Sequence, residues 1–124
     1  MAKVALAVDV GATKIALALV DRNYEVHEKS ELLIGGSTSK QLWDSIAQSA
    51  SQLIAGLNGN LLGVGIGSAG PLHLESGAIS PVNIPIWRNF PIVERLRALS
   101  GNQNVVLHGD AMATSQTNRN TRAS

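Results

Sequence analysis

An aspartate, a glycine, a threonine and a lysine lie close together near the start of the chain, in the segment Asp9-Val-Gly-Ala-Thr-Lys14. A carboxylate can hold a magnesium ion directly or through its waters, and a glycine lets backbone N–H groups approach phosphate oxygens. Thr13 adds a hydroxyl and Lys14 a positive charge. The segment is not a Walker A loop, because the G-x-x-x-x-G-K-[ST] spacing is absent. Taken alone, it is also compatible with an ordinary hairpin turn built from small residues.

Two further polar residues stand at positions where side chains can contact a ligand. The amide of Asn83 can donate and accept hydrogen bonds, and Pro81 and Pro85 restrict the loop around it. Asp110 follows a predicted buried strand, where a carboxylate can take a proton from an attacking hydroxyl or cap the helix that follows. Trp87 and Phe90 are expected to pack as anchors of the loop rather than to stack on a sugar.

A third pattern, Gly65-x-Gly67-x-x-Gly70, matches the spelling of the dinucleotide-binding fingerprint. That fingerprint requires a helix to begin at its last glycines. Here Pro71 and the alternating Leu72 and Leu74 predict extended chain instead, and no acidic residue stands about twenty positions further on. The context therefore argues against a nicotinamide cofactor.

The elements that must position these residues are indicated by the hydrophobic pattern. Val4 to Val8 and Ile15 to Val20 are β-prone runs on either side of a turn at residues 11–13, which predicts a hairpin. A third strand is expected from Glu25 to Ile34, ending at the glycines that follow. Three antiparallel strands then open the domain.

The next segment changes to a helical period. Thr38 and Gln41 fit a capping box at its start, and Asn58-Gly59 supplies residues that tolerate the left-handed conformation found at helix ends. Steps of three and four residues place one apolar face on this helix, formed by Leu42, Ile46, Ala50, Leu53, Ile54 and Leu57.

The second half of the chain alternates strands with one more helix. A buried strand is expected at Leu61 to Ile66, and a short hairpin at residues 72–79 turns at 75–77. Pro91 is suited to the first position of a helix through Leu99, and Val105 to Leu107 form a last buried strand. This order predicts an α/β domain with a mixed sheet and helices packed on it.

Composition narrows the classes of function. The 124 residues carry 10 basic and 9 acidic side chains without a basic stripe, so we expect no nucleic-acid or membrane partner and favour small molecules. The absence of cysteine excludes disulfides and cysteine-ligated zinc within these residues and fits a cytoplasmic location. His27, His73 and His108 are too irregularly spaced to predict a metal site.

Four segments in order resemble the ROK family of sugar kinases, in the hexokinase and actin superfamily. They are the hairpin VALAVDVGATKIALALVD, the strand end Gly65-Ile-Gly-Ser-Ala-Gly-Pro71, the loop Ser80-Pro-Val-Asn-Ile-Pro-Ile-Trp87-Arg-Asn-Phe-Pro91 and the strand end Val105-Val-Leu-His-Gly-Asp110. The resemblance implies a ribonuclease H-like lobe, as in actin-like ATPases, whose mixed sheet begins with an antiparallel three-stranded meander. We expect this lobe at residues 1–114, followed by a polar tail at 115–124 that is disordered or a truncated helix.

The resemblance also implies roles for residues in this sequence. Asp9, Gly11, Thr13 and Lys14 would bind the phosphates of ATP, with Asp9 holding Mg²⁺ directly or through water. Asp110 would be the catalytic base. Gly70, Asn83 and Gly109 would contact the sugar, although relatives typically have asparagine where this chain has Gly109. That departure removes one expected hydrogen bond to the sugar and bears on which sugar is bound.

The implied function is the N-terminal part of an ATP-dependent kinase that phosphorylates a hexose or an N-acetylhexosamine. An isolated lobe is expected to be inactive, because the family binds ATP between two lobes and places its zinc site beyond these residues. Its exposed face could promote homo-oligomers. The alternatives are the sugar-sensing domain of a ROK repressor and a non-catalytic sugar-binding fragment. The repressor is less favoured because its helix-turn-helix segment would precede the first strand.

Overall fold

The computed structural model describes residues 3–11, 13–35, 38–57, 59–68, 72–81, 84, 87–88 and 90–108. The elements follow in the predicted order, and their bounds are β1 (Val4–Val10), β2 (Lys14–Asp21), β3 (Val26–Leu33), α1 (Ser39–Ala55), β4 (Leu61–Ser68), β5 (Leu72–His73), β6 (Ala78–Ile79), α2 (Ile92–Ser100) and β7 (Val105–His108). The predicted boundary at residues 114 and 115 lies outside the described residues and stays a prediction.

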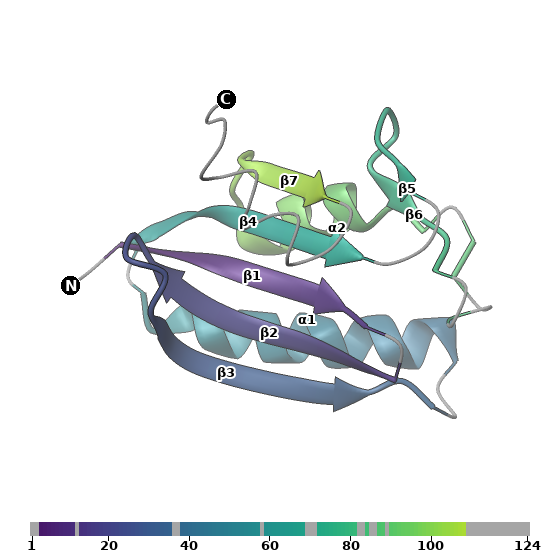
Figure 1. Cartoon of the computed structure of the whole chain (residues 1–124), viewed down its shortest axis with the longest axis horizontal. Helices are drawn as coiled ribbons and strands as arrows, with labels where there is room; N and C mark the ends of the chain where they lie inside the picture. Colours follow the sequence, from purple (N-terminus) through teal and green to yellow (C-terminus); the bar gives the residue numbers. More distant parts are fainter. Residues whose placement is uncertain are drawn as a thin grey trace.

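Five of the strands form one mixed sheet in the order β3-β2-β1-β4-β7, and β5 pairs with β6 in a separate hairpin. The chain first makes an antiparallel meander, in which β1 pairs with β2 and β2 with β3. It then adds β4 parallel to β1 and β7 parallel to β4. The arrows of β1, β4 and β7 therefore point the same way in Figure 1. The predicted mixed sheet with an opening meander is confirmed.

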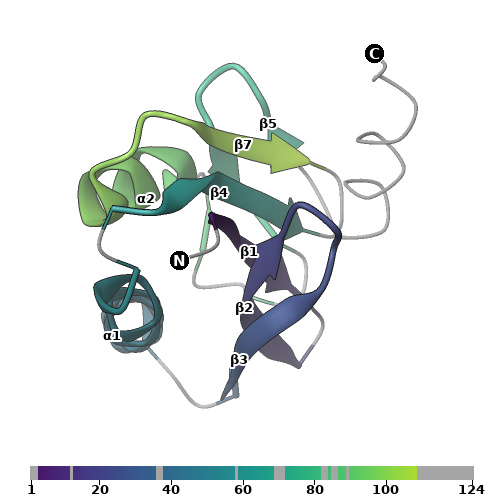
Figure 2. The same ribbon diagram turned by 90° about the vertical axis from the view of Figure 1, so that its left-hand side faces the viewer.

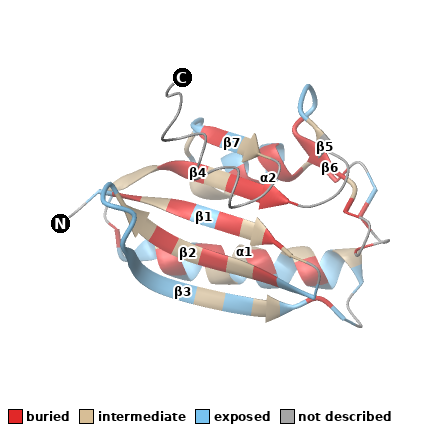
Figure 3. Cartoon of the chain, in the orientation of Figure 1, coloured by how far each residue is buried: buried red, intermediate tan, exposed pale blue. Residues whose placement is uncertain are grey.

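Both helices lie on the same side of the sheet, as Figure 2 shows. Side chains alternate along the strands, so in β1 the residues Val4, Leu6, Val8 and Val10 are buried toward the helices while Ala7 on the other face is exposed. Figure 3 shows this alternation in β1 and β2, and the mostly exposed surface of the edge strand β3. The core is therefore mainly a layer of aliphatic side chains between the sheet and the two helices, and Trp87 and Phe90 belong to the same cluster.

Helix α1 begins where the sequence predicts. The Thr38 hydroxyl accepts from the Gln41 amide and the Gln41 side chain accepts from the Thr38 amide, which completes a capping box. Its end was predicted too late, because the helix stops at Ala55 with Gly56 as its cap. Gly59 does adopt a left-handed backbone, with φ of 86°, but in the turn that leads into β4 rather than at the helix end.

Helix α2 starts one residue later than predicted, with Pro91 as the residue that precedes its first turn. It ends at Ser100, and its cap residue Gly101 has a φ of 67°, the left-handed conformation that glycine adopts without strain. The predicted turn at residues 75–77 is confirmed, and Gly77 supplies a φ of 70° there. Within the described ranges, neither α1 nor α2 combines the length and apolar character that a membrane-crossing helix requires.

Candidate functional site

The register of the sheet places five residues side by side in one row across all five strands. His108 on β7 lies opposite Gly67 on β4, Gly67 opposite Asp9 on β1, Asp9 opposite Ala16 on β2, and Ala16 opposite Glu31 on β3. Residues aligned in this way point to the same face of a sheet. Because Val8 and Val10 on either side of Asp9 are buried in the core under the helices, this row points to the face away from both helices. The row lies near the carboxyl ends of the parallel strands β1, β4 and β7, and α/β sheets bind ligands at this edge.

Small side chains surround Asp9 on this face. Its two neighbours in the row are Gly67 and Ala16, and Ala7 precedes it on the same face of β1. A Cβ atom placed on Gly65, opposite Ala7, would meet no other atom within 4 Å. The half-buried Asp9 therefore stands among small side chains, and the sheet face has open space at Gly65.

The turn after β1 is held by its own backbone. The Gly11 amide donates to the Lys14 carbonyl at 3.0 Å, and the Ile34 amide at the end of β3 donates to the Thr13 carbonyl at 3.0 Å. A Cβ atom on Gly11 would lie 3.0 Å from that Lys14 carbonyl, so the close turn favours glycine. Asp9, Gly11, Thr13 and Lys14, predicted together from the sequence, are thus brought together by β1, the turn and β2.

A charged cluster beside this turn was not predicted from the sequence. The Lys14 ammonium lies 3.2 Å from the Glu31 carboxylate on β3, and the Lys29 ammonium lies 3.4 Å from the same oxygen. Hydrogen bonds from Lys14 and then Lys29, reinforced by their positive charge, lower the pKa of Glu31 below its ordinary value. Alternation in β3 could have placed Lys29 and Glu31 on one face, but only the β2–β3 register brings them to Lys14.

The ends of the loop at residues 80–89 are joined by main-chain hydrogen bonds. Ile79 and Phe90 exchange two of them, each 2.9 Å long. Inside the loop the Ile84 amide donates to Pro81 at 3.1 Å, and the Trp87 amide donates to Ile84 at 2.9 Å. These bonds tie both ends of the loop to the lobe and close two turns within it.

Side chains fix the same loop from inside. Arg88 Nη1 lies 2.7 to 3.3 Å from the carbonyls of Pro81, Ile84 and Trp87. Trp87 is 1% exposed and stacks on Phe90 with 4.0 Å between the ring centroids, so the prediction that both are loop anchors is confirmed. Arg88 and Trp87 therefore tie the described residues of the loop to one another and to Phe90.

Four predicted site residues lie outside the described residues: Gly70, Asn83, Gly109 and Asp110. The structure describes β4 to Ser68, the loop around Asn83 at Pro81 and Ile84, and β7 to His108. The roles of those four residues therefore stay predictions. The chain is extended again in β5 from Leu72, as the argument against a dinucleotide fingerprint requires.

The described histidines make ordinary polar contacts. His27 pairs with Asp21 at 2.8 Å, and His73 lies 3.2 Å from the Ser80 hydroxyl. Among the described residues, no group of three histidine, aspartate or glutamate side chains converges as a metal site would require. The one metal ligand predicted from the sequence is Asp9, whose hard carboxylate oxygens suit Mg²⁺.

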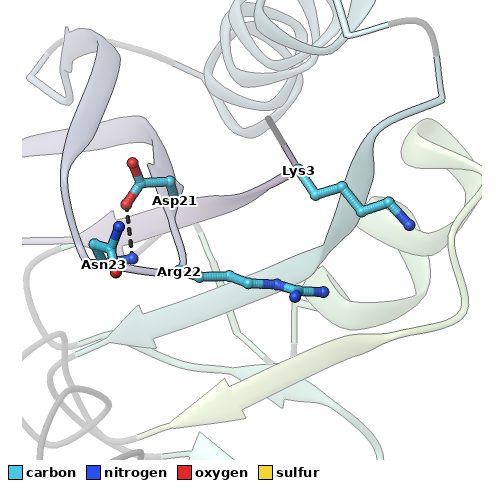
Figure 4. A pocket seen from close by; sticks show the side chains of 4 residues that line it. All are labelled: Lys3, Asp21, Arg22 and Asn23. Carbon is cyan, nitrogen blue, oxygen red and sulfur yellow. Dashed lines mark hydrogen bonds between the residues drawn. The ribbon is translucent and has the colours of Figure 1, made fainter. Parts of the chain in front are cut away.

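A hollow of about 370 Å³ at the opposite end of β1 is lined by Lys3, Asp21, Arg22 and Asn23. Figure 4 shows Lys3 and Arg22 extending away from the turn between β2 and β3, while the Asp21 carboxylate accepts a hydrogen bond from the backbone N–H of Asn23. Asp21 also accepts from the Glu25 amide and from His27, so it holds the β2–β3 turn together. Since this hollow lies near Val4 and the candidate site near Asp9, it takes no part in the site.

Comparison of the amino-acid sequence with known proteins identifies relatives of this chain. The model of the ROK family matches residues 5–122. N-acetylmannosamine kinase of Salmonella paratyphi A is 31% identical over 99 residues, which are 77% of this chain and 32% of that protein. The chain thus spans about a third of the length of the curated relatives that it matches.

Solved structures agree in fold. A ROK hexokinase from Thermus thermophilus superimposes with a TM-score of 0.72 at 28% identity, covering 97% of this chain and 39% of that one. A ROK family glucokinase from Streptomyces griseus, solved with glucose and AMPPNP, gives 0.62 at 26% identity and covers 86% and 33%. The predicted ribonuclease H-like, actin-like ATPase lobe is confirmed.

The space around two glycines of β4 differs, so alanine substitutions at these positions should have different effects on stability. Gly65→Ala should change the free energy of unfolding by no more than about 0.5 kcal/mol, because its new methyl group meets nothing. Gly63→Ala should destabilise by about 1–3 kcal/mol, because its Cβ would overlap Asn104, which packs over that glycine. Urea unfolding of both variants measures the difference, and equal stabilities would contradict the described packing.

The Asp21 contacts predict a pH-dependent stability. The hydrogen bond from His27, then the Glu25 and Asn23 amides, lower the pKa of Asp21 in the folded chain. Its contribution is therefore complete above the unfolded-state pKa of about 4 and is lost as the pH falls through the lower folded value. Urea unfolding should show Asp21→Asn less stable than the unsubstituted chain at pH 7, with the gap narrowing in acid.

A His27→Gln background serves as the control, since it removes the first cause of the lowered pKa. There the pH-dependent part of the gap should shrink. A gap that stays constant between neutral and acid pH would show that the Asp21 carboxylate does not contribute in this way.

Proposed function

The chain belongs to the ROK family, and on that premise we propose that it is the N-terminal part of an ATP-dependent sugar kinase. The observation that carries the proposal is the row of residues in which Asp9 stands between Gly67 and Ala16, directly before the tight turn to Lys14. A carboxylate among small side chains, close to the exposed Thr13 and the exposed Lys14 ammonium, suits a metal-bound polyphosphate.

In this proposal the β1–β2 hairpin binds the phosphates of ATP. Gly11 allows close approach of the backbone, the Thr13 hydroxyl donates to a phosphate oxygen, and the Lys14 ammonium neutralises charge. Asp9 holds Mg²⁺ directly or through water, and the metal would neutralise charge on the phosphates. The open space at Gly65 and the small neighbours of Asp9 support this placement.

The sugar would be bound by Gly70, Asn83 and Gly109. The closed loop held by Arg88 and Trp87 supports this, because a loop tied at both ends presents its side chains with less loss of entropy on binding. N-acetylmannosamine and glucose kinases are among the relatives, so the acceptor is a hexose or an N-acetylhexosamine. Gly109 stands where the family resemblance implies asparagine, and the loss of that hydrogen bond to the sugar would weaken selectivity or change the sugar that is bound.

Asp110 would act as the base. Its carboxylate takes the proton from the sugar hydroxyl as that oxygen bonds to the γ-phosphorus, and the bond from phosphorus to the β–γ bridging oxygen breaks to release ADP. This chemistry needs a cleft between two lobes, and the chain covers about a third of its curated relatives. The isolated chain is therefore proposed to be inactive.

The sugar-sensing domain of a repressor and a non-catalytic sugar-binding fragment remain alternatives with the same fold. The curated relatives at about 30% identity are kinases, which favours the kinase. Specific binding of operator DNA by a protein that contains this lobe would favour the repressor instead. The cytoplasmic location and self-association stay predictions from the sequence.

The role of Asp110 is tested in a protein that joins this lobe to a second ROK lobe. Asp110→Asn should lower kcat at least about a hundredfold, because a general base contributes on that scale, and should leave the Kd for the sugar within about threefold. A coupled assay of ADP release and calorimetry of sugar binding measure the two effects.

The purified 124-residue chain is the matched control and should give no sugar-dependent ADP release. Unchanged turnover in Asp110→Asn would remove the aspartate from the mechanism. Turnover by the isolated chain would refute the requirement for a second lobe.

A further inference from the structure

The Lys14–Glu31–Lys29 cluster shares one carboxylate between two ammonium groups. Both lysines approach the same Glu31 oxygen, at 3.2 Å and 3.4 Å. Lys14 lies opposite Leu33, Glu31 opposite Ala16 and Lys29 opposite Ala18, so all three point to the face that carries Asp9. The three side chains are 52%, 42% and 57% exposed, which leaves the cluster open to solvent and to a ligand.

The position of Glu31 conflicts with phosphate binding unless its charge is compensated. It lies two strands from Asp9, about 10 Å away, in the row that the proposed phosphate site uses. An unpaired carboxylate at this distance would repel a bound polyphosphate and would compete with it for the Lys14 ammonium. Lys29 resolves the conflict, because it can hold Glu31 when Lys14 turns to another anion.

We propose that Glu31 competes with phosphate for the Lys14 ammonium beside the hairpin and releases it to a phosphate group by exchange of partners, with Lys29 keeping Glu31 paired. The inference rests on the proposed binding of ATP phosphates by this hairpin. Before binding, the two lysines and the glutamate carry one net positive charge. After binding, Lys14 pairs with the phosphate, and Glu31 with Lys29 forms a neutral pair.

Exposed ion pairs contribute little free energy, so exchanging one partner for another should have a modest effect on affinity. Glu31→Gln removes the competing charge and should tighten binding of inorganic tripolyphosphate roughly two- to fivefold at low ionic strength. Lys29→Gln leaves Glu31 with Lys14 as its one partner in the cluster and should weaken binding by a similar factor. Both effects should fade as salt is added.

The double variant, with both Glu31→Gln and Lys29→Gln, distinguishes exchange of partners from a long-range electrostatic effect of each charge. If Lys29 acts through Glu31, Lys29→Gln should have almost no effect in a Glu31→Gln background. If each charge acts only through the long-range field, the two effects should add. Titration calorimetry of the 124-residue chain with tripolyphosphate, with circular dichroism to verify folding, measures all four members of the cycle.

Glu28→Gln is the matched control. It makes the same charge change on the same strand, but Glu28 lies opposite Leu19 and so faces the other side of the sheet. It should alter the Kd for tripolyphosphate less than Glu31→Gln does. An equal effect would attribute the result to net charge and overturn the inference.

The outcomes distinguish this inference from the proposed function. If the unsubstituted chain binds no tripolyphosphate, the proposed phosphate hairpin fails and the exchange of partners fails with it. If the chain binds tripolyphosphate but the cycle is additive, or Glu31→Gln weakens binding, only the inference about Glu31 is overturned.

Discussion

The candidate site depends on the hydrogen-bonded register of β1, the central strand. Antiparallel pairing with β2 sets Ala16 on one side of Asp9, and parallel pairing with β4 sets Gly67 on the other. A slip of one residue in either pairing would turn Asp9 toward the helices and Val8 or Val10 toward the open face. Burial of alternate valines and leucines of β1 against α1 and α2 makes such a slip costly, so the core holds the carboxylate in place.

The two faces of the sheet differ in the size of their side chains. Large aliphatic side chains fill the helix side, whereas alanine and glycine occupy much of the other face of β1, β2 and β4. Small residues contribute little burial, so their presence at Ala7, Ala16, Gly65 and Gly67 is better explained by the space that they leave. Stability and ligand access are therefore assigned to opposite faces of the same strands.

Local signals were sufficient for much of the fold. The turn residues at 11–13, the Thr38 capping box and the glycine after α2 predicted where elements begin or end, because each depends on contacts within a few residues. The end of α1 was missed, since both Gly56 and Asn58-Gly59 are compatible with a helix end and the local sequence does not distinguish them. The candidate phosphate-binding residues Asp9, Gly11, Thr13 and Lys14 were identified from the sequence because they lie within six consecutive positions.

Long-range features required the structure. The pairing of Lys14 with Glu31 depends on a register that shifts between Leu19 and Val20, and no local pattern in β3 specifies that shift. The hydrogen bonds from Arg88 to three carbonyls of the loop are likewise not indicated by any sequence motif. The roles of Asn83, Gly109 and Asp110 rest on the family resemblance, because nothing in the described residues bears on them directly.

Titration of the ¹⁵N-labelled chain with MgATP, followed by NMR, tests the central claim that the end of β1 binds phosphate. The amides of Val10, Gly11, Thr13, Lys14 and Gly67 should shift, and Asp9→Asn should abolish the magnesium-dependent part of those shifts. Shifts confined to the hollow at Lys3, Arg22 and Asn23, or shifts at the turn that are the same in Asp9→Asn, would contradict the account.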